Sequence, residues 1–344
     1  MADTKKEHYV PRCYLENFAT NQKRINVFDK WKTMVRNKQD IMQVAMENGF
    51  YDLDLMGLMK TLDGEKYKKM QHDLMEIVRT NDWEDVEKII SNKKYIEKEH
   101  FVEIEGAYSR VLKSIIHKSY NGNSWVMQTC YAKSKEEKLL LSYFIAIQDI
   151  RTKRFRETLS DLIEGTAQAL VHKTQMNNEQ AKTKEIFNVK ANPDFVKLQH
   201  SMMVLQPEIA FHLAEILENH VWVMCVNKTE LSFYTSDTPI VRIPHKRDKF
   251  MSHSGFASQG IEVAFPISPN LLLCMFDEST YGKLFKDRQF YEIHDLEEVK
   301  YYNSWQVIHS YRCVFSKNDD FSLALKLCQE NSVLKEYQSE VEVI

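Results

Sequence analysis

The chain has 344 residues and a formal net charge of −3, from 46 basic and 49 acidic side chains. This length allows a sizeable core, and the balanced charge argues against a protein whose main task is to coat nucleic acid. Only 9 glycines and 7 prolines occur, which favours helices over a turn-rich all-β fold. No apolar stretch typical of a signal peptide or a membrane span is present, so we expect a cytoplasmic protein without membrane contact.

The first fifty residues predict a compact α/β unit. Pro11 suits the first turn of a short helix over Cys13 to Phe18, and Arg24 to Phe28 alternates as a strand does. Asp40 to Asn48 is predicted to be helical and to stop at Gly49.

Between Lys60 and Leu217 the periodicity is almost wholly helical. Apolar residues recur at three- and four-residue spacing, between breakers such as "YNGNS" and "NVKANPD". The charged stretch "SNKKYIEKEH" is interpreted as a solvated linker or helix face. The predicted helices cover residues 66–79, 83–91, 98–117, 135–175, 178–186 and 193–218.

After His220 the period changes to two, which predicts strands. "VWVMCVN" and "LSFYTSD" predict a hairpin with a short turn, and "PIVRI", "IEVAFPIS" and "NLLLCMF" predict three more strands. A helix over Leu296 to Ser310, a strand at "YRCVFS" and a last helix from about Phe321 follow.

These elements predict an α+β fold, in which a helical central region packs on a mostly antiparallel C-terminal sheet. Six cysteines are scattered without a CxxC pair, which favours reduced, buried thiols over a zinc site. We expect a single domain over residues 1–344, with segments 7–55, 60–218 and 219–344.

Helical phase places polar side chains where the core is expected. Glu105 falls within the apolar stripe of 101–115, and Gln148 and Arg151 lie on the apolar face of the next long helix. Unpaired buried charges are costly, so Glu105 and Arg151 are predicted to pair, with Gln148 satisfying the remaining donors and acceptors. The alternatives are a purely structural salt bridge or a stripe edge placed too far inward.

The C-terminal third adds two weaker candidates. An alternating strand ends at Tyr234, and Ser236 and Asp237 follow it, before Pro239. A rigid scaffold often presents site residues at such a position, although an Asp there also commonly caps a turn. On the late helix, Asn303 and Gln306 share the face of apolar residues.

The run "RTKRFR" concentrates basic residues beside Arg151. Lys153, Arg154 and Arg156 point away from the Arg151 stripe, so they either contact phosphates or keep the helix soluble.

The stretches "HYVPRCYLENFA", "QDIRT", "TSDTPIV" and "FPISPNLLL" resemble the DUF4238 family, whose best-known signatures are HYVP and QxxRT. Both are intact here, as His8 to Pro11 and as Gln148, Arg151 and Thr152. The resemblance covers about residues 7–315, and the stretch 56–100 is interpreted as an insertion. Because the family has no assigned function, the resemblance implies no reaction, substrate or cofactor. It adds His8 to the residues selected by helical phase.

Together these residues predict one site between the helical region and the sheet. Arg151 would bind a phosphate or carboxylate, Gln148 would orient it, and His8 with Glu105 or Asp237 would act as general acid and base. Alternatively, the carboxylates and the histidine would hold a divalent metal, although no metal-ligand motif is present. The predicted ligand-binding residues are Tyr9, Thr152, Ser236 and Asn303.

The leading hypothesis is a hydrolase or transferase that acts on a nucleotide or nucleic acid, in a toxin or phage-defence role. The rival hypothesis is a non-catalytic ligand-binding or interaction module whose polar residues form a structural network. An open cleft with His8, Arg151 and Asp237 within about 8 Å of one another would favour the enzyme. A closed network with satisfied hydrogen bonds would favour the module.

Overall fold

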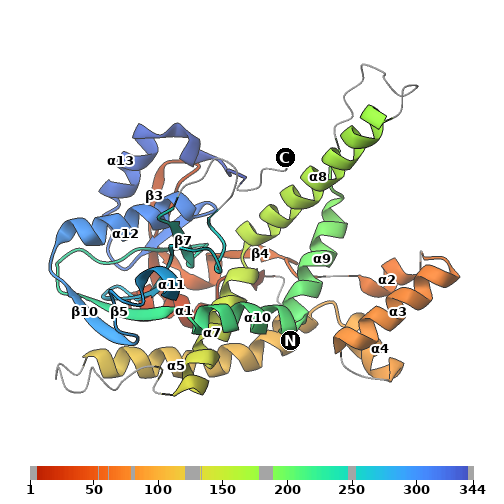
Figure 1. Ribbon diagram of the computed structural model, residues 1–344, viewed down its shortest axis with the longest axis horizontal. Helices are drawn as coiled ribbons and strands as arrows, with labels where there is room; N and C mark the ends of the chain where they lie inside the picture. Colours follow the sequence, from red (N-terminus) through yellow and green to blue (C-terminus); the bar gives the residue numbers. More distant parts are fainter. Residues whose placement is uncertain are drawn as a thin grey trace.

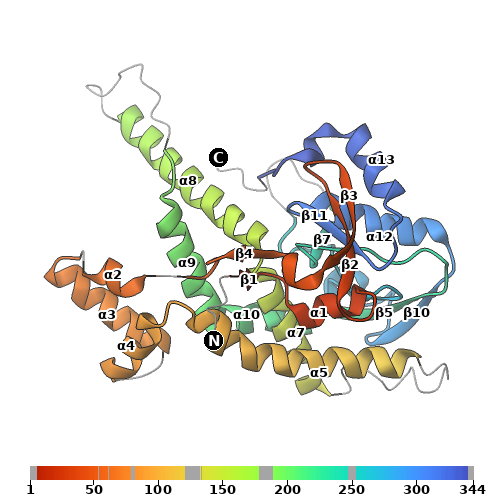
Figure 2. The ribbon, with the colours of Figure 1, turned by 180° about the vertical axis from the view of Figure 1, so that it is seen from behind.

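The computed structural model describes residues 6–339, except for residues 53, 61, 79–81, 121–131, 133, 178–188 and 247–252. A helical region lies beside a β-rich region, which confirms the predicted α+β class (Figure 1). The helices α8 (Lys153–Asn177) and α9 (Pro193–Leu205) extend from the body as an arm, as both ribbon views show (Figures 1 and 2).

The N-terminal segment is held by a short antiparallel strand pair. Strand β1 (Lys6–His8) pairs with β4 (Met46–Asn48), and helix α1 (Arg12–Leu15) begins after Pro11. The predicted helix over 40–48 is therefore wrong. That segment contains only a 3₁₀ turn at Ile41–Gln43, because its last residues pair with β1 instead of continuing a helix.

A four-stranded antiparallel sheet joins the two ends of the chain. Its order is β3-β2-β11-β6, with β2 (Arg24–Asp29) between β3 (Met34–Asp40) and β11 (Cys313–Ser316). The short strand β6 (Thr235–Ser236) completes it. The predicted strands at "RINVF" and "YRCVFS" are confirmed, and they are neighbours.

The second sheet is five-stranded and mostly antiparallel, in the order β10-β5-β9-β8-β7. The predicted hairpin between "VWVMCVN" and "LSFYTSD" is wrong, because β5 pairs with β9 and β10. After β5, the side chain of Asn227 accepts a hydrogen bond from the Thr229 N–H and donates one to the Leu231 carbonyl. These two hydrogen bonds stabilise a turn, after which the chain enters the four-stranded sheet as β6. The strands are β5 (Val221–Asn227), β7 (Val241–Pro244), β8 (Ile261–Ser268), β9 (Leu271–Phe276) and β10 (Gln289–Ile293), the last parallel to β5.

The helices that the sequence predicts over 66–79 and 83–91 are present and form a lobe beside the body (orange in Figure 1). The lobe has its own apolar cluster, to which α9 contributes Leu198. Its helices are α2 (Leu55–Met59), α3 (Gly64–Val78) and α4 (Trp83–Ser91).

Of the two interpretations of the stretch 91–100, the linker is wrong, because a π-helix at Ile96–His100 leads directly into α5 (Phe101–Tyr120), and the solvated helix face holds in part, since Lys98 and Glu99 are exposed. Ile96 is buried, and the side chain of Lys94 is only 12% exposed, since it forms ion pairs with Glu7 and Asp52.

The predicted helix over 135–175 is interrupted at residues 151 and 152, between α7 (Lys135–Ile150) and α8. The hydroxyl of Thr152 donates to the Asp149 carbonyl and accepts from the Phe155 N–H, so Thr152 caps the start of α8. Pro207 similarly separates α9 from α10 (Pro207–Glu218), and the predicted helix 178–186 lies outside the described residues. The remaining helices are α11 (Glu278–Tyr281), α12 (Leu296–His309) and α13 (Ser322–Glu330).

The main apolar core draws buried side chains from all three predicted segments, including Tyr14, Phe144 and Trp222. A single domain remains a prediction. Cys130 lies outside the described residues, and the other five cysteines are free thiols, as predicted; Cys225, Cys274 and Cys328 are buried, whereas Cys13 and Cys313 are partly exposed. No helix of the described chain is both long enough and apolar enough to cross a membrane.

Candidate functional site

Arg151, at the C-terminal end of α7, is 1% exposed. Its Nη1 donates to Glu105 Oε1 at 2.8 Å, and its Nη2 donates to the His8 carbonyl at 2.6 Å. The guanidinium lies over the Phe101 ring, with Cζ 3.8 Å from the ring centroid. Burial alone lowers the pKa of Arg151, but the charge of Glu105 reverses this and holds the pKa above its usual range. The ion pair predicted from helical phase is therefore present.

His8 joins this cluster through its backbone carbonyl. The histidine side chain is 4% exposed, and burial, followed by the charges of Arg12 and Arg151, lowers its pKa to about 4. The imidazole is therefore neutral near pH 7. Within the described chain its Nε2 has no hydrogen-bond partner. A base with so low a pKa is weak at neutral pH, which counts against general-base catalysis by His8.

Gln148 lies inside the core, as predicted, with 1% of its surface exposed. Gln148 is one of the residues that line a narrow crevice of about 10 Å³ between α5 and α7, together with Glu105, Tyr108 and Arg151. A crevice of this size holds about one water molecule. A nucleotide does not fit there.

Glu7, which the sequence reading missed, lies next to this cluster. Its carboxylate is fully buried, accepts from the Tyr51 N–H at 2.5 Å and pairs with Lys94 at 2.9 Å. Burial, followed by Asp52, raises the pKa of Glu7 to about 7. A three-residue strand shows too little alternation for the sequence to reveal that Glu7 points inward.

Asp237 lies in a separate network at the four-stranded sheet. Its carboxylate accepts the backbone N–H groups of Tyr311, Arg312 and Cys313 at 2.8, 2.9 and 2.7 Å. Burial raises its pKa, while these hydrogen bonds and the charge of Lys30 oppose the rise. Within the described ranges no hydrogen bond or ion pair joins Asp237 to His8 or Arg151. Asp237 therefore belongs to a different hydrogen-bond network from Arg151, although its charge contributes, after burial, to raising the pKa of Tyr9, the residue after His8.

The four predicted ligand-binding residues contact their own chain. The Tyr9 N–H donates to Ala45, and Thr152 caps α8. The Ser236 hydroxyl forms hydrogen bonds with Thr238 and Gln306, and Asn303 holds the backbone at Ser232 and Tyr234. A ligand-binding role for these residues remains a prediction.

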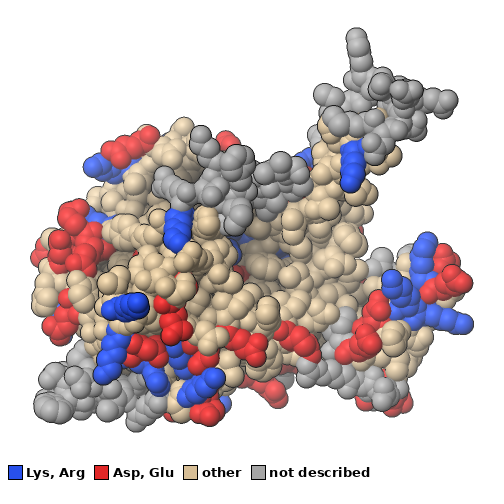
Figure 3. All heavy atoms as spheres, viewed as in Figure 1, with Lys and Arg blue, Asp and Glu red and all other residues tan. Residues whose placement is uncertain are grey.

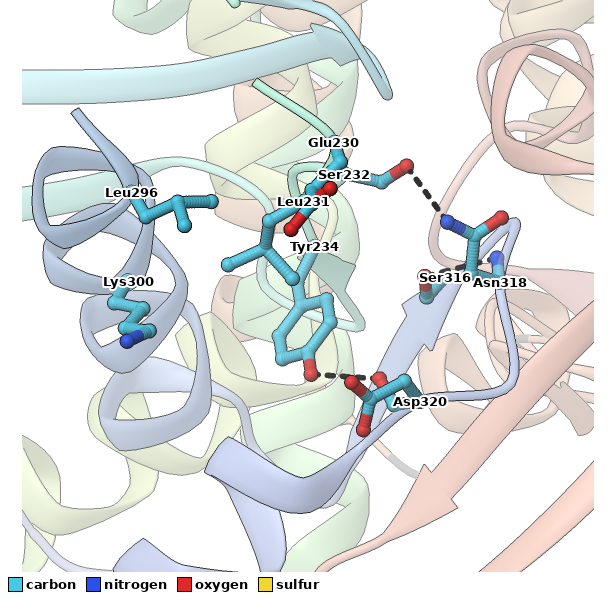
Figure 4. A pocket seen from close by; sticks show the side chains of 9 residues that line it. All are labelled: Glu230, Leu231, Ser232, Tyr234, Leu296, Lys300, Ser316, Asn318 and Asp320. Carbon is cyan, nitrogen blue, oxygen red and sulfur yellow. Dashed lines mark hydrogen bonds between the residues drawn. The ribbon is translucent and has the colours of Figure 1, made fainter. Parts of the chain in front are cut away.

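A larger pocket, of about 260 Å³, lies between the 230–234 loop, the start of α12 and the 316–320 loop (Figure 4). The ring of Tyr234 lies in it and its hydroxyl donates to the Asp320 carbonyl at 2.8 Å, while Leu231 and Leu296 supply apolar surface. Asn303 supports this pocket indirectly, through the backbone of Tyr234. The predicted catalytic residues do not line it.

A second guanidinium, that of Arg156, is half-buried on α8 and lies over the Phe50 ring, with Cζ 3.5 Å from the centroid. Its Nε and Nη2 lie 3.0 and 2.9 Å from Nδ1 of His200, whose Nε2 lies 2.8 Å from the Ile150 carbonyl. Because the carbonyl requires a donor, His200 carries its proton on Nε2 and accepts at Nδ1. Burial, followed by the charge of Arg156, lowers the pKa of His200 to about 3, so this partner is neutral.

Among the described residues, no carboxylate oxygen lies within 4.0 Å of a guanidinium nitrogen of Arg156, so Arg156 forms no ion pair there. Burial lowers its pKa to about 10, and the more distant carboxylates of Glu47 and Glu157 oppose this. Lys197 lies close enough for its pKa to be lowered by burial and then by Arg156, and its ammonium donates to the Gly49 carbonyl at 2.6 Å. In the sequence, the basic run "RTKRFR" drew attention to Arg156, whereas no feature of the sequence distinguished His200 from other histidines.

On the face drawn in Figure 3, outside the atoms shown in grey, acidic and basic side chains are intermingled. Among the described residues, no three His, Cys, Asp or Glu side chains form a group that would hold a metal ion. The divalent-metal alternative therefore has no supporting geometry in that part of the chain.

The model of the family "Protein of unknown function (DUF4238)" matches residues 6–320, which include both networks and Arg156. Neither the curated proteins nor the solved structures contain a match. The chain therefore belongs to the DUF4238 family, whose function is unassigned.

Proposed function

We propose that this protein is a non-catalytic binding module that recognises an anionic group, of the kind found in a nucleotide or nucleic acid, through Arg156. The observation that carries the proposal is a half-buried guanidinium held in place by an aromatic ring and a neutral histidine, without a paired carboxylate in the described chain.

The contacts of the signature residues His8 and Arg151 support a structural role for the network around Arg151. Arg151 is already neutralised by Glu105, and its Nη2 binds the backbone of His8. The adjoining crevice is too small for a nucleotide. Of the two hypotheses drawn from the sequence, the structural network fits this geometry better than a hydrolase or transferase site.

Arg156 has the features of an anion-binding group. The Phe50 ring and His200 fix the plane of its guanidinium, so little conformational entropy is lost when an anion binds. One edge of the guanidinium is directed at His200, which leaves N–H groups on Nη1 for oxygen atoms of a phosphate or carboxylate. Lys197 adds a second positive charge nearby.

The test is a titration of the full-length protein at low salt with pyrophosphate, ATP and a short single-stranded RNA, followed by calorimetry. Arg156→Gln should lower the affinity about tenfold or more, which corresponds to ~1.4 kcal/mol or more. The control is Lys173→Gln, which removes the same charge from an exposed position of α8 and should leave the affinity nearly unchanged. Equal binding by wild type and Arg156→Gln, or no binding of any probe by wild type, would show that the proposal is wrong.

A second assay addresses the absence of catalysis. Wild type and Arg151→Ala are incubated with pooled RNA, DNA and nucleotides, with and without magnesium or manganese. We expect no turnover by either protein, whereas turnover by wild type alone would restore the hydrolase or transferase hypothesis. A toxin or phage-defence role and a cytoplasmic location remain predictions.

A further inference from the structure

Three side chains around the Arg151 crevice have buried polar atoms without hydrogen-bond partners in the described part of the chain. These atoms are both amide atoms of Gln148, the hydroxyl of Tyr108 and Nε of Arg151. All three side chains line the same crevice, whose volume is about 10 Å³. Gln148, Tyr108 and Arg151 are 1%, 2% and 1% exposed, so bulk solvent does not satisfy these atoms.

Buried polar atoms without partners are unfavourable, and folded proteins nearly always pair them with protein groups or ordered water. A cavity needs roughly 10–15 Å³ and two to four polar partners to hold a water molecule. The crevice has about this volume, and the three residues that carry the unpartnered atoms are among those that line it.

The charges around the crevice determine which ligand fits. Glu105 also lines it, and its carboxylate forms the ion pair with Arg151. Because these two charges neutralise each other, neither an anion nor a cation would find a net opposite charge there to offset the loss of its hydration. The ligand must therefore be small, neutral, and able both to donate and to accept hydrogen bonds.

We propose that the crevice is a binding site for one ordered water molecule. The water accepts hydrogen bonds from Nε of Arg151 and from the Tyr108 hydroxyl, and donates one to Oε1 of Gln148. It thereby links α5, which carries Tyr108, to the end of α7, which carries Gln148 and Arg151. In this arrangement the glutamine of the QxxRT signature is a water ligand, which accounts for a polar residue on a buried helix face.

A high-resolution crystal structure of the full-length protein tests this site directly. We expect one solvent peak within about 2.7–3.2 Å of Arg151 Nε, Tyr108 Oη and Gln148 Oε1. A crevice without density, a larger molecule or an ion there, or a direct hydrogen bond between Gln148 and Tyr108 would overturn the proposal.

A variant provides a second test. Gln148→Met replaces the amide with an apolar side chain of similar length, and we expect the solvent peak to disappear from its crystal structure. Persistence of the peak at the same position would show that Gln148 does not hold the water. Anion binding by Arg156 should be the same in Gln148→Met as in wild type, so failure of the water site and failure of the proposed function remain distinguishable. If the variant does not fold, the wild-type density alone decides.

Discussion

Arg151 and Arg156 are five residues apart, on either side of the junction between α7 and α8, and differ in the partner that orients each of them. Both guanidiniums lie over an aromatic ring, at 3.8 Å from Phe101 and 3.5 Å from Phe50. Arg151 is paired with a carboxylate and is closed to solvent, whereas Arg156 is oriented by a neutral imidazole and remains half-exposed. A carboxylate neutralises the arginine that it pairs with. A neutral histidine orients the guanidinium without neutralising it, so the positive charge remains available to a ligand.

The largest effect on stability is expected for Arg151→Ala, because it leaves the Glu105 carboxylate without its partner and frees the His8 carbonyl. We expect a loss of about 3–4 kcal/mol in the free energy of unfolding, measured by urea denaturation. The double variant Arg151→Ala/Glu105→Gln should lose less, because the unpaired charge is also removed. A loss below ~1 kcal/mol for the single variant would mean that the pair is not structural.

Asp237→Asn should be the next most destabilising change. An amide oxygen cannot accept three backbone N–H groups as a carboxylate does, so the turn at Tyr311 to Cys313 loses hydrogen bonds. We expect a loss of about 2–3 kcal/mol by the same measurement. The exposed Asp319→Asn is the matched control, and equal stability of the two variants would contradict a structural role for Asp237.

Acid should weaken the fold through His8 and His200. Their pKa values are lowered to about 4 and about 3, so below the usual value of 6.5 the unfolded chain binds protons that the folded chain does not. Stability is therefore lost as the pH falls from about 6.5 towards 4. Glu7, with a pKa raised to about 7, acts in the opposite direction between about 7 and 4.5, but two histidines outweigh it.

Urea midpoints at pH 7, 6 and 5 measure this pH dependence. His200→Gln should show a smaller decrease from pH 7 to pH 5 than wild type, whatever its stability at pH 7. An unchanged decrease would show that His200 is protonated in the folded protein.

The smallest effect on stability is expected for Arg156→Lys, because the site is half-exposed and the positive charge is kept. We expect a loss of at most about 1 kcal/mol, yet several-fold weaker binding of pyrophosphate, since an ammonium lacks the planar fork of a guanidinium. Calorimetry and urea denaturation of the same sample measure the two effects. A stability loss as large as that of Arg151→Ala would remove the distinction between the two arginines.

Helical periodicity was enough to select Glu105, Gln148 and Arg151, because α5 and α7 are long and carry apolar residues at helical spacing; it did not reveal that α7 is buried on all sides from Phe144 to Ile150. It assigned the 40–48 segment wrongly, because the strand pairing there depends on three residues near the N-terminus. Asp237 was selected as a strand-end residue, but its partners are backbone groups 74 to 76 positions later, which no local pattern reveals. His200 was missed for a similar reason, since its two partners come from α7 and α8.

The position of β11 between β2 and β6 fixes an order of events during synthesis of the chain. The side-chain amide of Asn26 donates to the Lys317 carbonyl, 291 positions later, and Asn26 to Asp29 of β2 pair with β11. The hairpin of β2 and β3 therefore forms with one edge of β2 unpaired, and this edge is covered only after residues 313–316 have left the ribosome. Closing so long a loop is slow, and an unpaired strand edge invites aggregation. Loss of residues 313–344 would remove β11 and leave this edge unpaired.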